Sequence, residues 1–210
     1  MILSQNIPPT LKLLLLGLWL AAATVAHAQP WTPQINWQRE GQEDNSRYGY
    51  SILPLEDQNG DGYADFGIYQ PGGGTTPSKV ELFHGGNPPS QTPYLVISSD
   101  SLWHIEPSPH ILGDINGDGY MDWYLIADST ANPSSYGYAF IYFGGPNQAT
   151  TPNIVWPFTA YWQYFSPIRD LNGDGYDDLL FSDAWNEHAA VYFGGNTLDT
   201  IPDLRLPWGG

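Results

Sequence analysis

Three short segments of the chain place aspartates at a fixed spacing. They read DQNGDGYAD over residues 57–65, DINGDGYMD over 114–122 and DLNGDGYDD over 170–178. Alternate residues of a tight loop turn toward one centre, so positions 1, 3, 5, 7 and 9 of each segment can direct oxygen atoms to the same point. Ca²⁺ binds roughly six to eight oxygen ligands in flexible geometry. The spacing therefore predicts three calcium-binding loops.

The predicted ligands are of the same kind in each loop. Aspartates at positions 1, 5 and 9 and asparagine at position 3 offer side-chain oxygens, while tyrosine at position 7 offers its backbone carbonyl and leaves its ring to pack. Glycine at position 6 permits the positive φ of a sharp turn. We expect about three structural calcium ions, bound by Asp57, Asn59, Asp61, Tyr63 and Asp65, by Asp114, Asn116, Asp118, Tyr120 and Asp122, and by Asp170, Asn172, Asp174, Tyr176 and Asp178.

Two other structures share parts of this pattern. A solvated turn built from Asx and Gly residues needs no metal, but three copies that keep every ligand position favour metal binding. An EF-hand needs a glutamate at position 12 and flanking helices, whereas position 12 is Ile68, Leu125 or Phe181. The sequence therefore excludes an EF-hand.

The loops belong to a longer repeat. They begin 57 and 56 residues apart, and each is followed by an apolar element that ends in two glycines. These elements read LFHGG at 82–86, YFGG at 142–145 and YFGG at 192–195. Self-similarity at such a period is typical of repeat architectures.

The segments between the loops have the patterns of strands. Residues 79–83 (KVELF) alternate polar and apolar side chains, which predicts a strand with one buried face. Residues 122–127 (DWYLIA) and 139–143 (AFIYF) are short apolar runs, which predict strands buried on both faces. No window keeps helical spacing for the roughly ten residues that a helix needs. Each repeat thus offers about four short strands, the plan of a β-propeller blade.

The motif DxNGDGxxD followed by an aromatic–Gly–Gly element resembles the FG-GAP repeat of integrin α-subunit propellers and of many bacterial exported proteins. Residues 48–68 (YGYSILPLEDQNGDGYADFGI) are especially similar to that pattern. The resemblance covers residues 49–208 and implies propeller blades with calcium held in the loop that joins the first two strands of each blade. His84 departs from the pattern, because the other two copies have phenylalanine at that place.

These observations predict an all-β chain with three four-stranded propeller blades at residues 48–106, 107–161 and 162–210, after a lead-in segment at 29–47. Closed propellers have about four to eight blades, and those of the resembling family usually have more than three, so the prediction is an incomplete or partial propeller. We expect a fragment of a longer chain, a protein that assembles with copies of itself, or an open array of three blades.

Residues 1–28 are predicted to be a secretory signal peptide. Lys12 precedes the apolar run 13–25, and Ala26-His27-Ala28 has the form of a cleavage site. The run is shorter than the roughly 20 residues that cross a bilayer, which argues against a membrane anchor. The sequence therefore predicts a secreted protein, extracellular or periplasmic, with no membrane span after cleavage.

Composition limits the classes of partner. The 210 residues carry a formal net charge of -16 and no cysteine, so the surface repels nucleic acid and anionic lipid and thiol chemistry is excluded. Aromatic residues make up 15% of the chain, which supplies material for a core. The tryptophans that recur in the repeats are expected to pack between blades, or else to form a binding face for carbohydrate or protein; they are Trp103, Trp123, Trp156, Trp162 and Trp185.

No metalloprotease spacing, nucleophile elbow or phosphate-binding loop is present in the sequence. We therefore predict a calcium-stabilised, non-enzymatic module for adhesion or recognition, whose partner is an extracellular protein or a glycan. The alternative is a polysaccharide lyase or hydrolase, or an accessory module of one, because two carboxylates at a suitable separation suffice for glycoside hydrolysis.

Overall fold

The computed structural model describes residues 37–41, 46–72, 76–99, 103–105, 109–129, 137–158, 163–183 and 188–207. The chain divides into two compact units, and the second, Trp37–Gly210, contains all of these residues. The predicted signal peptide lies outside the described ranges. Within them all regular structure is β. The described residues include no helix that is long and apolar enough to cross a membrane.

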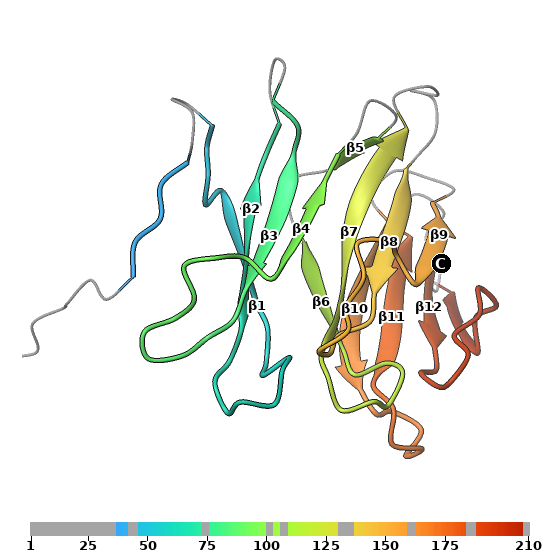
Figure 1. Ribbon diagram of the computed structural model, residues 1–210. Coiled ribbons are helices and arrows are strands. Elements are labelled where there is room, and N and C mark those ends of the chain that lie inside the picture. The colour runs from blue at the N-terminus through green and yellow to red at the C-terminus, as the bar shows by residue number, and fades with distance from the viewer. Residues whose placement is uncertain are drawn as a thin grey trace, which may run out of the picture. The chain divides into compact units, whose positions relative to one another are not determined.

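The strands form three antiparallel sheets that follow one another along the chain (Figure 1). The first sheet has the order β1 (Ser51–Pro54), β2 (Phe66–Gln70), β3 (Lys79–Phe83) and β4 (Leu95–Ser98). The second has the order β5 (Trp103–Ile105), β7 (Asp122–Ser129), β8 (Tyr138–Tyr142) and β9 (Ile154–Pro157), and β6 (His110–Gly113) also pairs with β7. The third has the order β10 (Gln163–Arg169), β11 (Asp178–Asp183), β12 (His188–Tyr192) and β13 (Leu204–Pro207). The predicted all-β class with repeated four-stranded sheets is confirmed, and the second sheet has a fifth strand because β5 and β6 both pair with β7.

Each acidic loop connects the two strands of a β-hairpin, and the three hairpins have equivalent positions in their sheets. The loops lie between β1 and β2, between β6 and β7, and between β10 and β11. Strands flank every loop, as the sequence predicted when it excluded an EF-hand.

The burial of β3 differs from the prediction. Alternation over this strand indicated one buried face, but Val80 and Glu81, on opposite faces, are 0% and 4% exposed. A strap formed by Trp37–Gly41 covers the second face, and its Trp37 ring lies 5.6 Å from the ring of Phe83. The pattern within β3 cannot report a cover that comes from a distant part of the chain. β7 is buried on both faces, as predicted. In β8 one face is buried through Ala139 and Ile141, whereas Phe140 on the other face is only partly buried, so the predicted two-sided burial holds there only in part.

Each sheet has two faces that we name by their neighbours. The forward face is directed toward the following sheet, and the backward face toward the preceding one. Leu53, Val80 and Leu82 on the forward face of the first sheet share one buried cluster with Trp123 and Leu125 on the backward face of the second. The first two sheets therefore pack through an apolar core.

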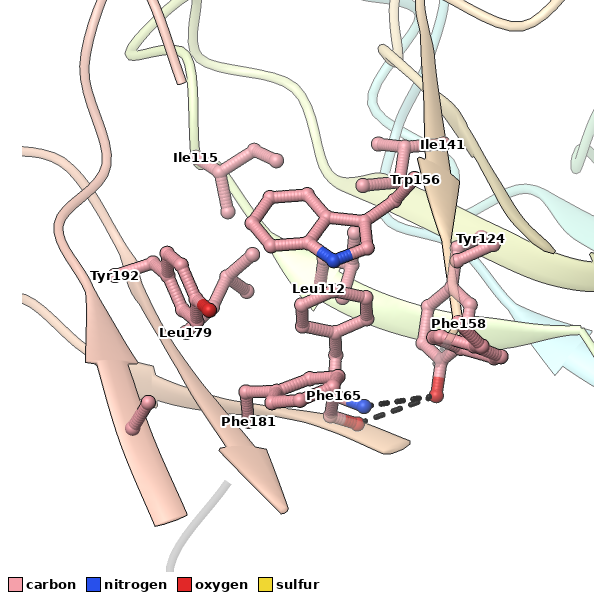
Figure 2. Packing of buried hydrophobic residues seen from close by; sticks show 12 residues of the cluster. Leu112, Ile115, Tyr124, Ile141, Trp156, Phe158, Phe165, Leu179, Phe181 and Tyr192 are labelled. Atoms are coloured by element: carbon pink, nitrogen blue, oxygen red, sulfur yellow. Dashed lines mark hydrogen bonds between the residues drawn. The ribbon is translucent and has the colours of Figure 1, made fainter. Parts of the chain in front are cut away.

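A second core joins the second and third sheets (Figure 2). The forward face of the second sheet supplies Tyr124, Ile141 and Trp156, and the backward face of the third supplies Phe165 and Phe181. The ring of Trp156 meets that of Phe165 edge-on at 5.0 Å. The Tyr124 hydroxyl lies 3.3 Å from both the backbone N and the backbone O of Phe165. Burial raises the pKa of Tyr124 to about 12.

The predicted packing role of the tryptophans holds where the structure describes them. Trp123 and Trp156 are buried in the two cores between the sheets. The side chain of Trp103 and the whole of Trp162 and Trp185 lie outside the described part of the chain.

Candidate metal-binding loops

The three acidic loops close on themselves through the same hydrogen bonds. In the first loop the amide N of Asp61, at position 5, lies 3.1 Å from Asp57 Oδ1 and 2.9 Å from Asn59 Oδ1. The corresponding distances are 3.0 and 3.0 Å in the second loop and 3.1 and 3.0 Å in the third. The side-chain oxygens of positions 1 and 3 therefore lie around one atom in every copy.

The carboxylate at position 1 also accepts the backbone amide of the glycine at position 6. The distances are 2.6, 2.9 and 2.9 Å in the three loops. The Gly62 amide, with those of its neighbours, holds the pKa of Asp57 below its ordinary value. The position 6 glycines have φ of 87°, 89° and 95°, as predicted. The glycines at position 4 also have positive φ, a requirement that the sequence interpretation missed.

The remaining side chains at the rim of the loops also form hydrogen bonds within each loop. Asn59 Nδ2 donates to Asp61 Oδ2 at 3.0 Å, and the Tyr63 amide donates to Asp61 Oδ1 at 2.9 Å, with equivalent bonds in the other two loops. The ring of Tyr120 lies against Gly145, in line with the predicted packing. That prediction is wrong for Tyr63, whose side chain is 49% exposed.

The aspartate at position 9 lies at the base of each loop, not at its rim. Asp65, Asp122 and Asp178 are 2%, 0% and 0% exposed. Each accepts the amide of position 2 of its own loop, at 3.0, 3.0 and 2.7 Å. Each also accepts the amide of the first glycine of the double-glycine element, at 2.7, 2.8 and 2.9 Å. This carboxylate therefore fastens the loop to the double glycine of the same repeat.

The need for glycine in that element follows from the close approach of the two segments. A Cβ on Gly85, Gly144 or Gly194 would lie 2.1, 2.4 or 2.3 Å from the backbone O of position 8 of the loop. Such distances are far shorter than a carbon and an oxygen tolerate. The loop and the double glycine recur together in the sequence because they form one unit.

The charge of the second loop is poorly compensated. Burial raises the pKa of Asp122 to about 7, and the amides of Gly144 and Ile115 oppose this shift only in part. The nearby carboxylates of Asp118 and Asp114 raise the pKa further. A divalent cation in the loop would relieve this repulsion between like charges.

The loops hold a donor set that suits calcium, although their carboxylates do not converge as they stand. In the part of the chain that the structure describes, no three Asp, Glu, His or Cys side chains come together as a metal site. Backbone amides occupy the carboxylates at positions 1 and 9. Each carboxylate oxygen can accept more than one bond, and the donors at positions 1, 3, 5 and 9 are all hard oxygens of the type that Ca²⁺ prefers. The ligand assignment stays a prediction.

The loops also connect neighbouring repeats. Gln58, at position 2 of the first loop, is fully buried, and its Oε1 accepts the amide of Gly145 in the second repeat at 2.8 Å. The backbone O of Ile115, at position 2 of the second loop, accepts the amide of Gly195 in the third repeat at 2.8 Å. Sequence reasoning missed this role, although position 2 is one of the two positions, with position 8, that vary in an otherwise constant motif.

His84 makes one contact that its phenylalanine counterparts cannot, through a ring nitrogen. Its Nδ1 lies 3.2 Å from Asp65 Oδ2, and its ring stacks on Tyr94 at 4.1 Å between centroids. The histidine thus joins the buried aspartate of the first loop to the edge of the first sheet.

Comparison with known proteins gives a weak link. No protein-family model matches the chain. An alignment over 93 residues, which covers 40% of the chain, is 32% identical to integrin alpha-PS2 of Drosophila melanogaster. The chain spans 7% of the length of that integrin. Together with the repeated four-stranded sheets, this similarity supports a distant relation to integrin α-type β-repeats.

Proposed function

We propose that the chain is an exported, non-enzymatic β-repeat module for adhesion or recognition, stabilised by calcium in its three acidic loops. The observation that carries the proposal is the threefold recurrence of one loop geometry, in which oxygens of positions 1 and 3 surround the same amide. The similarity to an integrin α chain supports adhesion over other uses of such a scaffold.

The proposed role of calcium is structural. The carboxylate at position 9 connects each loop to the double glycine, so a bound ion would stabilise the sheet as well as the turn. A ligand that binds only the folded state contributes about 2.7 kcal/mol per site at a hundred times its dissociation constant. The chain has no cysteine, so disulfides cannot take over this role.

Calcium titration tests the metal assignment. We expect chelation to lower the melting temperature by about 5–10 °C for each site lost, from about 2.7 kcal/mol per site and about 2–4 °C per kcal/mol. Excess calcium should restore it better than magnesium, and calorimetry should count three sites. Asp61→Ala, Asp118→Ala and Asp174→Ala should each reduce that count by one.

The control is Glu56→Ala, which removes an exposed carboxylate next to the first loop. It should leave the calcium-dependent part of the melting temperature unchanged. That part, and not the melting temperature alone, is the readout, because Asp61→Ala also removes hydrogen bonds within the loop. A melting curve that is the same in chelator and in calcium would refute the metal assignment.

Recognition is tested separately with neutral and acidic glycans and with extracellular matrix proteins. Retention of one of these probes without any product supports the proposal. Release of shortened oligosaccharides would replace it with an enzymatic function.

A further inference from the structure

The forward face of the third sheet exposes large apolar side chains, beside the exposed Ser166 and Ser182. Tyr164, Leu204 and Leu206 on this face are 39%, 44% and 48% exposed. In the first and second sheets the place of Leu206 is taken by Ile97 and Trp156, which are only 7% and 4% exposed. The next sheet covers those two residues. The third sheet therefore presents a face that its two counterparts bury.

The loop of the third repeat shows the same difference. Position 2 is Gln58, Ile115 and Leu171 in the three loops, with exposures of 0%, 1% and 56%. The first two are buried against the double glycine of the following repeat, whose second glycine donates its amide to them. Leu171 has the apolar side chain of a contact residue and no such neighbour in the described part of the chain.

The opposite end of the array offers the complementary groups. Gly86 is the counterpart of Gly145 and Gly195, but within the described residues its amide has no acceptor. On the backward face of the first sheet, Ile52 and Val96 are 65% and 40% exposed. This side of the first repeat therefore presents the amide donor and the apolar side chains of such a contact without the acceptor that a preceding repeat would supply.

The strap covers the centre of that backward face. The Trp37 ring lies 5.3 Å from that of Phe66, and its Nε1 donates to the backbone O of Ser90 at 2.9 Å. Arg39 forms an ion pair with the buried Glu81 at 3.3 Å and donates to the backbone O of Gln91 at 2.8 Å. The strap thus takes the place that a preceding sheet has at the second and third sheets.

We propose that the forward face of the third sheet binds the backward face of the first sheet in a second copy of this chain, and that the strap opposes this contact by occupying the same surface. The contact continues an interface that already occurs twice within one chain. β1 contacts β6 and β6 contacts β10, so β10 would contact β1 of the second copy. The proposal does not depend on the calcium assignment.

Two geometries of assembly are compatible with such a head-to-tail contact. Two copies joined at both ends bring together six sheets, twice the three that the described residues of one chain form. Six lies within the roughly four to eight blades of closed propellers. If the rotation does not close, the same contact gives longer oligomers. Both outcomes raise the mass in solution.

Sedimentation equilibrium of the chain from Gln29 onward is the first test, in buffer of physiological ionic strength. The intact chain should be monomeric. Trp37→Ala combined with Arg39→Ala should at least double the weight-average mass, and adding Leu171→Asp and Leu206→Asp should restore the monomer. Ile201→Asp is the matched control, because Ile201 is 71% exposed and lies in a loop, outside the forward face. Association that persists without the forward face, or no association without the strap, overturns the proposal.

Cysteine pairing keeps the test decisive if the double strap variant does not fold. The chain has no cysteine, so Ile52→Cys and Tyr164→Cys can be made in separate chains that also carry the milder Arg39→Ala change. After mixing and oxidation, heterodimers should exceed both homodimers. An excess of Tyr164→Cys homodimers would indicate a symmetric contact between two forward faces, and a statistical mixture would indicate no specific contact. Either result overturns the proposal.

Discussion

Replacing Trp156 by alanine should weaken the packing between the second and third sheets and lower the free energy of unfolding. Trp156 is 4% exposed, and its ring meets those of Phe165 and Tyr192 edge-on at 5.0 and 4.8 Å. Truncation of a buried Trp costs about 3–5 kcal/mol, and each such aromatic pair adds about 0.5–1.5 kcal/mol beyond buried area. We therefore expect a loss near the upper end, about 4–5 kcal/mol in the free energy of unfolding.

The assay is urea unfolding followed by fluorescence and circular dichroism, with a thermal melt beside it. At about 2–4 °C per kcal/mol, the melting temperature should fall by about 8–20 °C. Val155→Ala is the matched control, because Val155 directly precedes Trp156 in the same strand, points to the other face and is 50% exposed. It should change the free energy of unfolding by less than about 0.5 kcal/mol.

The place of the damage is a second readout. In a linear array each repeat is stabilised by its own packing and by its neighbours, so amide hydrogen exchange should accelerate in β11 and β12 more than in β2 and β3. A loss below about 1 kcal/mol, or equal acceleration in all three sheets, would show that Trp156 does not connect the third repeat to the second.

Two further variants test contacts between distant segments. Gln58→Ala should lower the free energy of unfolding by about 1–3 kcal/mol, because it leaves the amide of Gly145 without its acceptor. Denaturant titration measures this loss. The control is Gln91→Ala, which removes an exposed side chain and should have no comparable effect. Glu81→Gln should flatten the loss of stability in acid. Burial acts to raise the pKa of Glu81, but the hydrogen bonds from Lys79 and Tyr48 and the charge of Arg39 outweigh it and hold the pKa below its ordinary value. The ionised form therefore contributes stability above the unfolded pKa of about 4.3, and this contribution is lost as the pH falls through the lower folded pKa. Equal slopes below about pH 4 in wild type and variant would contradict the assignment.

The sequence was sufficient for the local plan of the fold. Spacing within each repeat predicted the acidic loops between strands, the positive φ of Gly62 and its counterparts, and the two-sided burial of β7. These features depend on residues close together in sequence, where turn chemistry and strand periodicity are strong signals. The β character of the chain follows from the same signals.

Contacts between distant segments were not predictable in this way. The strap covers Phe83 and pairs with the buried carboxylate of Glu81, although it lies far from β3 in the sequence. Gln58 gave no signal as a contact between repeats, because its counterparts Ile115 and Leu171 have a different chemistry. The contact is evident only in the structure, where Gln58 and Ile115 are buried against the following repeat and Leu171 is exposed.

The aspartate at position 9 shows why the loop motif and the double glycine must be interpreted together. Sequence spacing assigns Asp65, Asp122 and Asp178 to a metal, and the structure gives each of them two backbone amides. The two roles are compatible, because a carboxylate accepts several bonds. A cation bound at the rim would then stabilise a loop whose lower end is already fixed to the sheet. Through position 2 the same base reaches the next repeat, so the effect of calcium on one loop should extend to the interface that follows it.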